Sequence, residues 1–440
     1  MLRRLVALAC LVGLALPAAA TADPPWSPTQ NLSTPHLFVD PVDVTASGDG
    51  TALAWWRWQD GSGSNAAPSA SVSSRPSGGA FGPERAAPAG IQDIQAFAQT
   101  RAVALTARAP RLTAPTRLAV AFGSTSGTFG SERRIVDEPA LGGIPKLGVN
   151  AQGDAAIAYY RNLGGTNNRV MVSLRRAGGA FGAPFQIAHG RIRSVAVAVG
   201  AVGDVLVAWD ARGTIQARYR SPDASGFQPI ETIASDPTFF AQMQPLVDDR
   251  GRCYLAWSAQ LLTEGGTRGP VFNEVAVRPV RHHFRAAQLL ERDGSNRSQA
   301  PLVIVTTGRD ATVAWTGFDG ANSRVRVAST DPSARFGAPQ DVSPAGGDGV
   351  VSDLDYRSGN QLVVWDNGSF DANQVFAAVA PPGAPFGPAE AVSAAQEARA
   401  GKALMVPAPT VVWTNRPAGS HPPGGVGAVQ TFAQAATRTG

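Results

Sequence analysis

The chain of 440 residues contains 44% hydrophobic and 16% charged residues, with 48 glycines and 34 prolines. This composition suffices for a large core, and the glycines and prolines indicate turns between short strands instead of long helices. The formal net charge is +5, but the basic residues are scattered among acidic ones, which argues against a nucleic-acid surface. We therefore expect no nucleic-acid partner. After residue 22 no apolar stretch reaches membrane-spanning length, so we also expect no membrane anchor.

The first 22 residues have the three parts of a secretory signal. Arg3 and Arg4 precede an apolar stretch, and small residues ending at Ala22 follow it. We therefore expect cleavage after Ala22, a secreted, extracellular protein and a mature chain of residues 23–440. Cys10 leaves with the signal, so Cys253 is the single remaining cysteine and we expect no intramolecular disulfide.

An apolar run that ends in an aromatic residue recurs along the chain every 48 to 58 residues. Its copies include TALAWW at 51–56 and QLVVW at 361–365, and AVALT at 102–106 is a degenerate copy. A period this regular indicates one repeat architecture and excludes a series of unrelated domains. We take as repeat anchors Trp55, Thr106, Tyr159, Trp209, Trp257, Trp315, Trp365 and Trp413.

Each repeat is predicted to contain four strands: one before a turn, the apolar run, a third strand, and a short fourth strand. The turns between the first two strands are small or rich in Asp and Asn, as at 47–50 and 358–360, which is typical of tight hairpins. The second strand is apolar without alternation, which indicates that both its faces are buried. The fourth strand begins at an aromatic signal found at Phe81, Phe129, Phe181, Phe227, Phe284, Phe336 and Phe386.

Four-stranded units of about 50 residues with buried faces predict an all-β fold, a single β-propeller. Eight blades are favoured, and seven is the alternative if the segment at Thr106 is not a blade. The last repeat lacks a fourth strand, and WSPTQNLS at 26–33 is similar to the fourth strand FGPAEAVS at 386–393. We predict that 26–33 completes the last blade and closes the ring, which removes an exposed sheet edge. The expected repeats span 42–89, 91–139, 144–190, 192–236, 240–293, 298–346, 349–394 and 397–435.

The arrangement resembles secreted bacterial β-propellers of the sialidase-like and WD-repeat-like kinds. The string SGDGTALAW at 47–55 has the Ser, Asp and Trp of a sialidase Asp-box at a different spacing. Trp209-Asp210 and Trp365-Asp366 match only the second residue pair of a WD repeat. FGAP strings are similar to the integrin FG-GAP repeat, but its calcium loop is missing from the units. The resemblance implies a ring of blades and assigns no activity.

The strand before each hairpin is expected to be innermost and to line a central channel. Counting back twelve positions from the anchors gives Asp43 in the first repeat and Asp353 in the seventh, and Asp355 lies on the side of Asp353. The last repeat contributes Arg399 and Lys402 near the same level. Three interpretations stay open for this cluster: a structural ion-pair network, ligand binding, or catalysis by paired carboxylates.

Trp56 and Trp58 extend beyond the first anchor towards a loop rich in Gly and Ser, and one of them is a candidate stacking platform for a ligand. The long connections 57–72 and 258–274 are predicted to lie on one face of the ring, where binding loops gather. The histidines show no metal-ligand spacing and Cys253 is expected in the core, so we predict no metal and no cofactor.

These features favour a secreted, monomeric, non-catalytic module that binds a glycan or an extracellular protein. The alternative is a glycan-cleaving enzyme, a glycoside hydrolase or polysaccharide lyase, with Asp43, Asp353 or Asp355 at the channel mouth. A further alternative is an extracellular scaffold without a small ligand.

Overall fold

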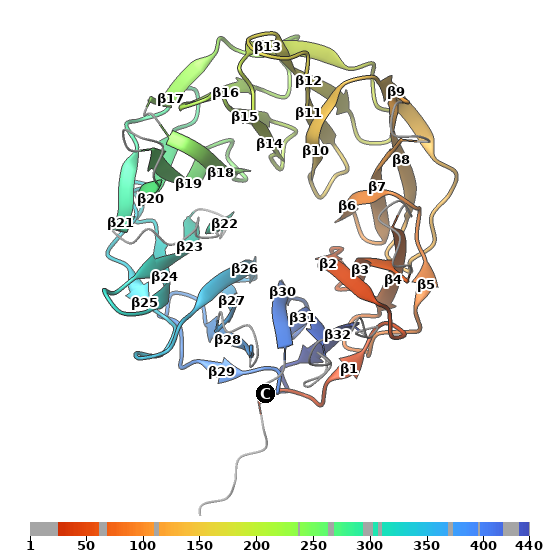
Figure 1. The fold of residues 1–440 in the computed structure, drawn as a ribbon, viewed down its shortest axis with the longest axis vertical. Helices are drawn as coiled ribbons and strands as arrows, with labels where there is room; N and C mark the ends of the chain where they lie inside the picture. The colour runs from red at the N-terminus through yellow and green to blue at the C-terminus, as the bar shows by residue number, and fades with distance from the viewer. Residues whose placement is uncertain are drawn as a thin grey trace, which may run out of the picture.

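The strands of this protein form eight antiparallel four-stranded sheets, arranged as blades around a ring (Figure 1). Every regular element among the residues described by the computed structural model is a β-strand. The predicted eight-bladed propeller is confirmed, and the segment around Thr106 is a complete blade. The structure describes residues 25–60, 68–109, 114–235, 238–262, 268–293, 302–306, 310–367, 373–394, 397–416 and 431–439. The predicted signal at 1–22 and the central parts of the connections 57–72 and 258–274 lie outside these residues.

The first four blades follow one another in chain order, each from its inner strand to its outer strand. Blade 1 contains β2 (Phe38–Ala46), β3 (Ala52–Gln59), β4 (Ser69–Arg75) and β5 (Arg85–Ala86). Blade 2 contains β6 (Ile91–Phe97), β7 (Arg101–Arg108), β8 (Thr116–Ser124) and β9 (Arg133–Glu138). Blade 3 contains β10 (Leu141–Val149), β11 (Ala155–Arg161), β12 (Asn168–Arg175) and β13 (Phe185–Gly190). Blade 4 contains β14 (Ser194–Val199), β15 (Val205–Asp210), β16 (Thr214–Arg220) and β17 (Glu231–Ser235).

The next three blades repeat this order, and the eighth blade is split between the two ends of the chain. Blade 5 contains β18 (Thr238–Val247), β19 (Cys253–Leu262), β20 (Arg268–Arg278) and β21 (Gln288–Asp293). Blade 6 contains β22 (Leu302–Thr306), β23 (Ala311–Phe318), β24 (Ser323–Ser329) and β25 (Gln340–Asp341). Blade 7 contains β26 (Val350–Arg357), β27 (Asn360–Asp366), β28 (Val375–Ala380) and β29 (Glu390–Ala391). Blade 8 contains β30 (Glu397–Met405), β31 (Pro409–Arg416), β32 (Phe432–Thr437) and β1 (Gln30–Asn31).

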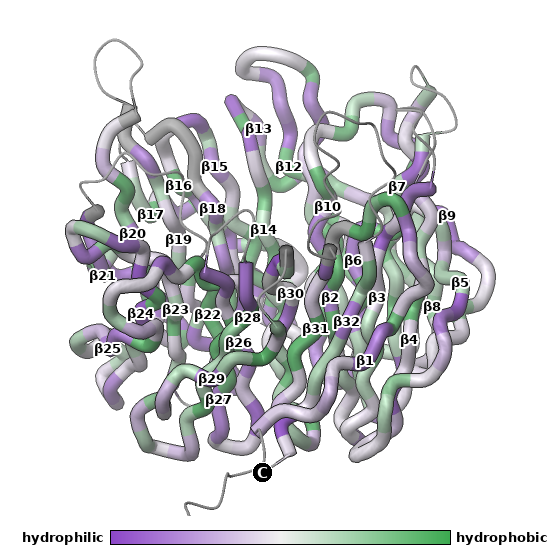
Figure 2. Tube along the Cα trace, turned by 60° about the horizontal axis from the view of Figure 1, so that its bottom comes forward, coloured by the Kyte–Doolittle hydropathy of each residue, from purple (hydrophilic) through white to green (hydrophobic). Residues whose placement is uncertain are grey.

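The ring closes through the N-terminal strand, as predicted. β1 pairs with β32, with Gln30 opposite Ala435, and the backbone N–H of Leu32 donates to Ala433 O at 2.8 Å. Trp26 forms a further bridge to Arg438 and is buried against blade 7. Figure 2 shows β1 lying beside β32 at the outer wall of the ring. One blade is therefore built from both ends of the chain, which leaves no open edge between first and last repeats.

The apolar runs fill the contacts between blades, which we call seams. The anchor residue of each second strand faces the preceding blade. In blade 1 the residue that faces the preceding blade is Trp56, and not Trp55 as predicted. Trp55 faces blade 2 and packs on Ile91, the register partner of Thr106. Trp55 therefore supplies the large ring at the seam between blades 1 and 2, where the anchor Thr106 is small. The structural anchors are Trp56, Thr106, Tyr159, Trp209, Trp257, Trp315, Trp365 and Trp413.

The aromatic signal before each fourth strand has a hydrogen-bonding role. Gln340 of blade 6 donates to Phe386 O at 3.0 Å and accepts from Phe386 N at 3.1 Å, across the seam to blade 7. Gln288 binds Phe336 in the same way across the next seam back. Both glutamines stand four residues after an aromatic signal, at what we call the clasp position. A side chain at this position ties its blade to the following one.

Candidate functional site

The eight inner strands surround the axis of the ring (Figure 1). In each blade we compare the inner-strand residue that pairs with the second-strand residue directly before the anchor. In five consecutive blades, from blade 7 to blade 3, that residue is charged. We call these residues the charged arc: Asp353, Lys402, Asp43, Asp93 and Lys146. The other three blades place Ala196, Gln244 and Val303 there. Charge is thus confined to one side of the axis at this level.

A β-bulge precedes every member of the charged arc. The pairing register of the inner strand shifts directly before the charged residue in blades 7, 8, 2 and 3, and between Val39 and Val42 in blade 1. A bulge bends the strand and redirects the side chain that follows it. In β30 the extra residue is Gly401, where an added Cβ would lie 1.9 Å from Val412 O. Only glycine fits at that bulge, which therefore fixes the place of Lys402.

Asp353 and Asp355 connect blade 7 to blade 8. Asp353 accepts a hydrogen bond from the backbone N–H of Ala403 at 2.9 Å and lies 3.5 Å from Lys402 Nζ. Asp355 accepts from the backbone N–H of Met405 at 2.7 Å. Burial raises the pKa of Asp355 to about 6, and the Met405 N–H partly offsets this effect. Asp353 and Asp355, two of the three predicted carboxylates, therefore stabilise the contact between blade 7 and the split blade 8.

Asp43 and Asp93 occupy neighbouring blades and have fewer partners. Asp43 accepts from the adjacent backbone N–H of Val44 at 2.7 Å, and Asp93 accepts from Gln95 Nε2 at 3.0 Å. Burial raises the pKa of Asp43 to about 6, although the charge of Lys402 opposes the change. Burial raises the pKa of Asp93 to about 7, and repulsion from Asp43 adds to it. Burial thus raises the pKa of both carboxyl groups towards neutral pH.

Lys402 lies between carboxylates on both sides. The negative charge of Asp353 raises the pKa of Lys402 above its usual value, burial opposes the change, and Asp43 and Asp93 add to it. The side chain of Lys402 is 36% exposed and that of Asp353 is 14% exposed, so both retain contact with solvent. With all five groups ionised, three carboxylates and two ammonium groups leave the charged arc with one net negative charge.

The structure brings together Asp43, Asp353, Asp355 and Lys402, as the sequence predicted. Arg399 lies before the bulge of β30, exposed, opposite Thr414, and so at a different level from the charged arc. Trp56 is 0% exposed in the seam between blades 8 and 1, so the predicted stacking role is wrong for this residue. Trp58 is half-buried, with one face stacked on His36 at 4.1 Å between ring centroids.

Asp93 and Lys146 belong to the charged arc and were not identified from the sequence. Counting back twelve positions from Thr106 and Tyr159 arrives at Ile94 and Leu147, each one residue too far along the strand. Because side chains alternate along a strand, an error of one residue selects the opposite side. In both strands a charged residue stands directly before the apolar residue reached by the count. This pattern is the sequence signal that could have identified Asp93 and Lys146.

Other candidate chemistry is limited among the described residues. They contain no group of three or more His, Cys, Asp or Glu side chains placed to hold a metal ion. Cys253 is buried in the core, and burial raises the pKa of its thiol. No helix in the described part of the chain is long and apolar enough to span a membrane.

No protein-family model and no curated protein matches the sequence. Among solved structures, the Dos1 propeller has a TM-score of 0.50 at 11% identity, over 93% of this chain and 95% of that one. The periplasmic gluconolactonase PpgL of Pseudomonas aeruginosa has a TM-score of 0.47 at 15% identity, over 74% and 93%. The polysaccharide lyase PL25 ulvanlyase has a TM-score of 0.45 at 9% identity, over 75% and 89%. Likeness at these identities shows the propeller fold alone.

Proposed function

We propose that the protein is a secreted, non-catalytic module that binds a glycan at the ring axis, on the charged arc. The observation that carries this proposal is the confinement of Asp353, Lys402, Asp43, Asp93 and Lys146 to one level of five consecutive blades. Sugar hydroxyls donate to carboxylates and accept from ammonium groups, so an arc that contains both suits a polyhydroxylated ligand. Its net charge, at most one negative charge, favours a neutral or weakly charged glycan.

The charges of Asp43 and Asp93 make the folded state less stable, which supports a role in binding. A carboxyl group whose pKa is raised by burial is disfavoured in its ionised form, so its presence lowers stability near neutral pH. Asp353 and Asp355 offset such a cost by accepting hydrogen bonds from blade 8, whereas among the described residues Asp43 and Asp93 accept hydrogen bonds from their own strands. Buried ionised groups that lower the stability of the fold are typically retained at functional sites.

Glycan cleavage is the second candidate, and the pKa values of Asp43 and Asp93 favour it. Burial raises the pKa values of these neighbouring carboxyl groups to about 7 and about 6, so each can take up or release a proton near neutral pH. One proton donor beside one base is the arrangement that acid–base cleavage of a glycosidic bond requires. This candidate predicts released products, which the binding module does not form.

The test is retention of the mature chain, residues 23–440, on a panel of neutral and uronate-containing polysaccharides, with released products assayed in parallel. We expect retention without products, and loss of retention in Asp93→Asn. This variant is informative because removal of the buried charge is expected to stabilise the fold, so lost retention cannot be attributed to unfolding. Asp341→Asn, on the outer strand β25 and paired with Arg326, is the control that keeps retention.

The possible outcomes separate the functions. Products that disappear in Asp93→Asn would support the glycan-cleaving enzyme instead. Absence of both retention and products would contradict both proposals and favour the extracellular scaffold, which pull-down of a partner protein then tests. Secretion itself is checked by recovery of a chain beginning at Asp23 from the culture medium.

A further inference from the structure

An arginine ends the third strand, or directly follows it, at the same register in five blades. The arginine pairs with the second-strand residue that stands four positions before the anchor. In blade 1, for example, Arg75 pairs with Ala52, four positions before Trp56. This register places the side chains of Arg75, Arg278 and Arg438 against the preceding blade. The five residues are Arg75, Arg175, Arg220, Arg278 and Arg438.

Two of these arginines bind a glutamate at the clasp position of the preceding blade. Arg278 Nε lies 3.4 Å from Glu231 Oε1 across the seam between blades 4 and 5. Arg438 donates to both carboxylate oxygens of Glu390, at 2.9 and 3.0 Å, across the seam between blades 7 and 8. The same pair of positions thus forms a charge-assisted contact at two different seams.

Arg75 occupies this position at the seam between blades 8 and 1, but the clasp residue there is neutral. Gln30 donates to Phe81 O at 2.6 Å and accepts from Phe81 N at 3.2 Å. The guanidinium of Arg75 is 1% exposed and donates to Thr437 Oγ1 at 2.9 Å, to Thr410 Oγ1 and to Val406 O. These acceptors are neutral, and among the described residues no carboxylate forms an ion pair with Arg75. Burial lowers the pKa of Arg75 to about 10.

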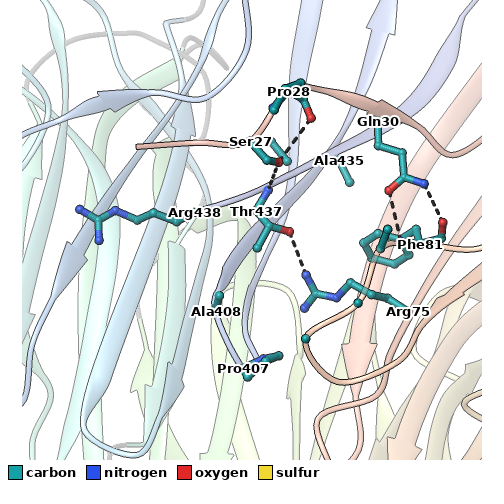
Figure 3. A pocket seen from close by; sticks show the side chains of 14 residues that line it. Ser27, Pro28, Gln30, Arg75, Phe81, Pro407, Ala408, Ala435, Thr437 and Arg438 are labelled. Atoms are coloured by element: carbon teal, nitrogen blue, oxygen red, sulfur yellow. Dashed lines mark hydrogen bonds between the residues drawn. The ribbon is translucent and has the colours of Figure 1, made fainter. Parts of the chain in front are cut away.

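A hollow of about 490 Å³ adjoins Arg75 at this seam (Figure 3). Figure 3 shows the guanidinium directed towards Thr437, with Pro407 and Ala408 on one side and Phe81 and Gln30 on the other. The lining also contains Ser27, Pro28, Ala435 and Arg438, and none of its described residues is acidic. Nε of Arg75 is a buried donor without a hydrogen-bond acceptor among the described residues. A buried cation without a counter-ion is unfavourable, and an anion of suitable size would relieve this.

We propose that the hollow at the seam between blades 8 and 1 binds a small carboxylate, which supplies the negative charge that Glu231 and Glu390 supply at the other two seams. Arg75 is the cationic partner. The hydroxyl groups of Ser27 and Thr437 line the same space and select for an oxygen-rich ligand such as an organic acid or an acidic sugar. This site is independent of the charged arc, because it is built from the split blade and the outer part of blade 1.

The test supplies the carboxylate from the protein itself. In Gln30→Glu the new side chain can accept from Phe81 N, as Glu231 accepts from Phe284 N at 2.8 Å, while its charge meets Arg75. We expect Gln30→Glu to raise the Tm by about 2 °C or more at pH 7 without added ligand. With the wild-type protein we expect acetate to raise the Tm in a concentration-dependent manner at constant ionic strength, and acetamide to have no effect.

The matched control is Gln340→Glu at the seam between blades 6 and 7. Gln340 forms the same clasp with Phe386, but Ala380 stands where Arg75 stands, so the new carboxylate finds no arginine at that register. Gln340→Glu is expected to leave the acetate response intact without raising the Tm. Gln30→Glu is expected to abolish the response. An acetate effect that persists in Gln30→Glu, its absence from the wild type, or equal Tm changes in the two variants would overturn the proposal.

Discussion

Replacement of Asp93 by Asn is expected to stabilise the protein at neutral pH. Burial and the neighbouring charge of Asp43 raise the pKa of Asp93 from 3.8 to about 7 in the folded state. Because the folded pKa is raised, the contribution of Asp93 to the free energy of unfolding is largest below pH 4. It falls as the pH rises from 4 to about 7 and is constant above that. The amide of Asn carries no charge and avoids this loss.

The size of the effect follows from the shift of about three pKa units. Each unit corresponds to about 1.4 kcal/mol, so the upper bound is about 4 kcal/mol at pH 8. Asp93 is half-buried and retains contact with water, which reduces the expected gain to about 2 kcal/mol. Near pH 4 the wild type and Asp93→Asn are expected to be equally stable.

The assay is urea-induced unfolding of the wild type and variant at pH 4, 6 and 8, monitored by tryptophan fluorescence. Asp49→Asn is the control of opposite sign, because hydrogen bonds from Ser47 and Thr51 lower the pKa of Asp49 at its exposed turn. That variant is expected to lose stability at pH 8 and to approach the wild type as the pH falls through the lowered pKa. A difference between wild type and Asp93→Asn that is independent of pH, or a destabilised Asp93→Asn at pH 8, would refute the reasoning.

Two further substitutions test the packing of the ring. Trp55→Ala is expected to cost about 3 to 5 kcal/mol because its indole is buried in the seam between blades 1 and 2. Trp58→Ala removes a half-buried ring and should cost less by urea unfolding. Equal costs would contradict the assigned role of Trp55. Glu390→Gln removes the partner of Arg438 and a charged acceptor of the Trp26 indole N–H, and is expected to cost about 1 to 3 kcal/mol. Unchanged stability with retained resistance of the N-terminal segment to proteolysis would contradict a role in ring closure.

The architecture was predictable because it depends on features that repeat. The aromatic period, the turns and the octet at 26–33 each specify a whole strand or blade, and β1 pairs with β32 as the sequence indicated. Thr106 was ambiguous because the large ring at its seam, Trp55, lies in the preceding repeat. A sequence motif does not reveal such compensation between blades.

The candidate site was predictable only in part. Asp43, Asp353, Asp355 and Lys402 were found, but Asp93 and Lys146 were not, since β-bulges change the offset between anchor and inner strand from blade to blade. Trp56 was assigned to the surface because it follows an apparent anchor, whereas it is the anchor itself. The hollow at Arg75 depends on which residue occupies the clasp position of another blade. That comparison becomes possible only when the seams are aligned in three dimensions.

The most direct test of the proposed function is the affinity of one retained glycan for the wild type, Asp93→Asn, Asp43→Asn and the control Asp341→Asn, measured by calorimetry. If the charged arc holds the glycan, the first two variants should bind at least about tenfold more weakly at about pH 8, where both carboxyl groups are ionised, since each loses a charge-assisted hydrogen bond worth roughly 1.5 to 3 kcal/mol. Asp341→Asn should bind like the wild type. Equal affinity in all four proteins would contradict binding at the ring axis.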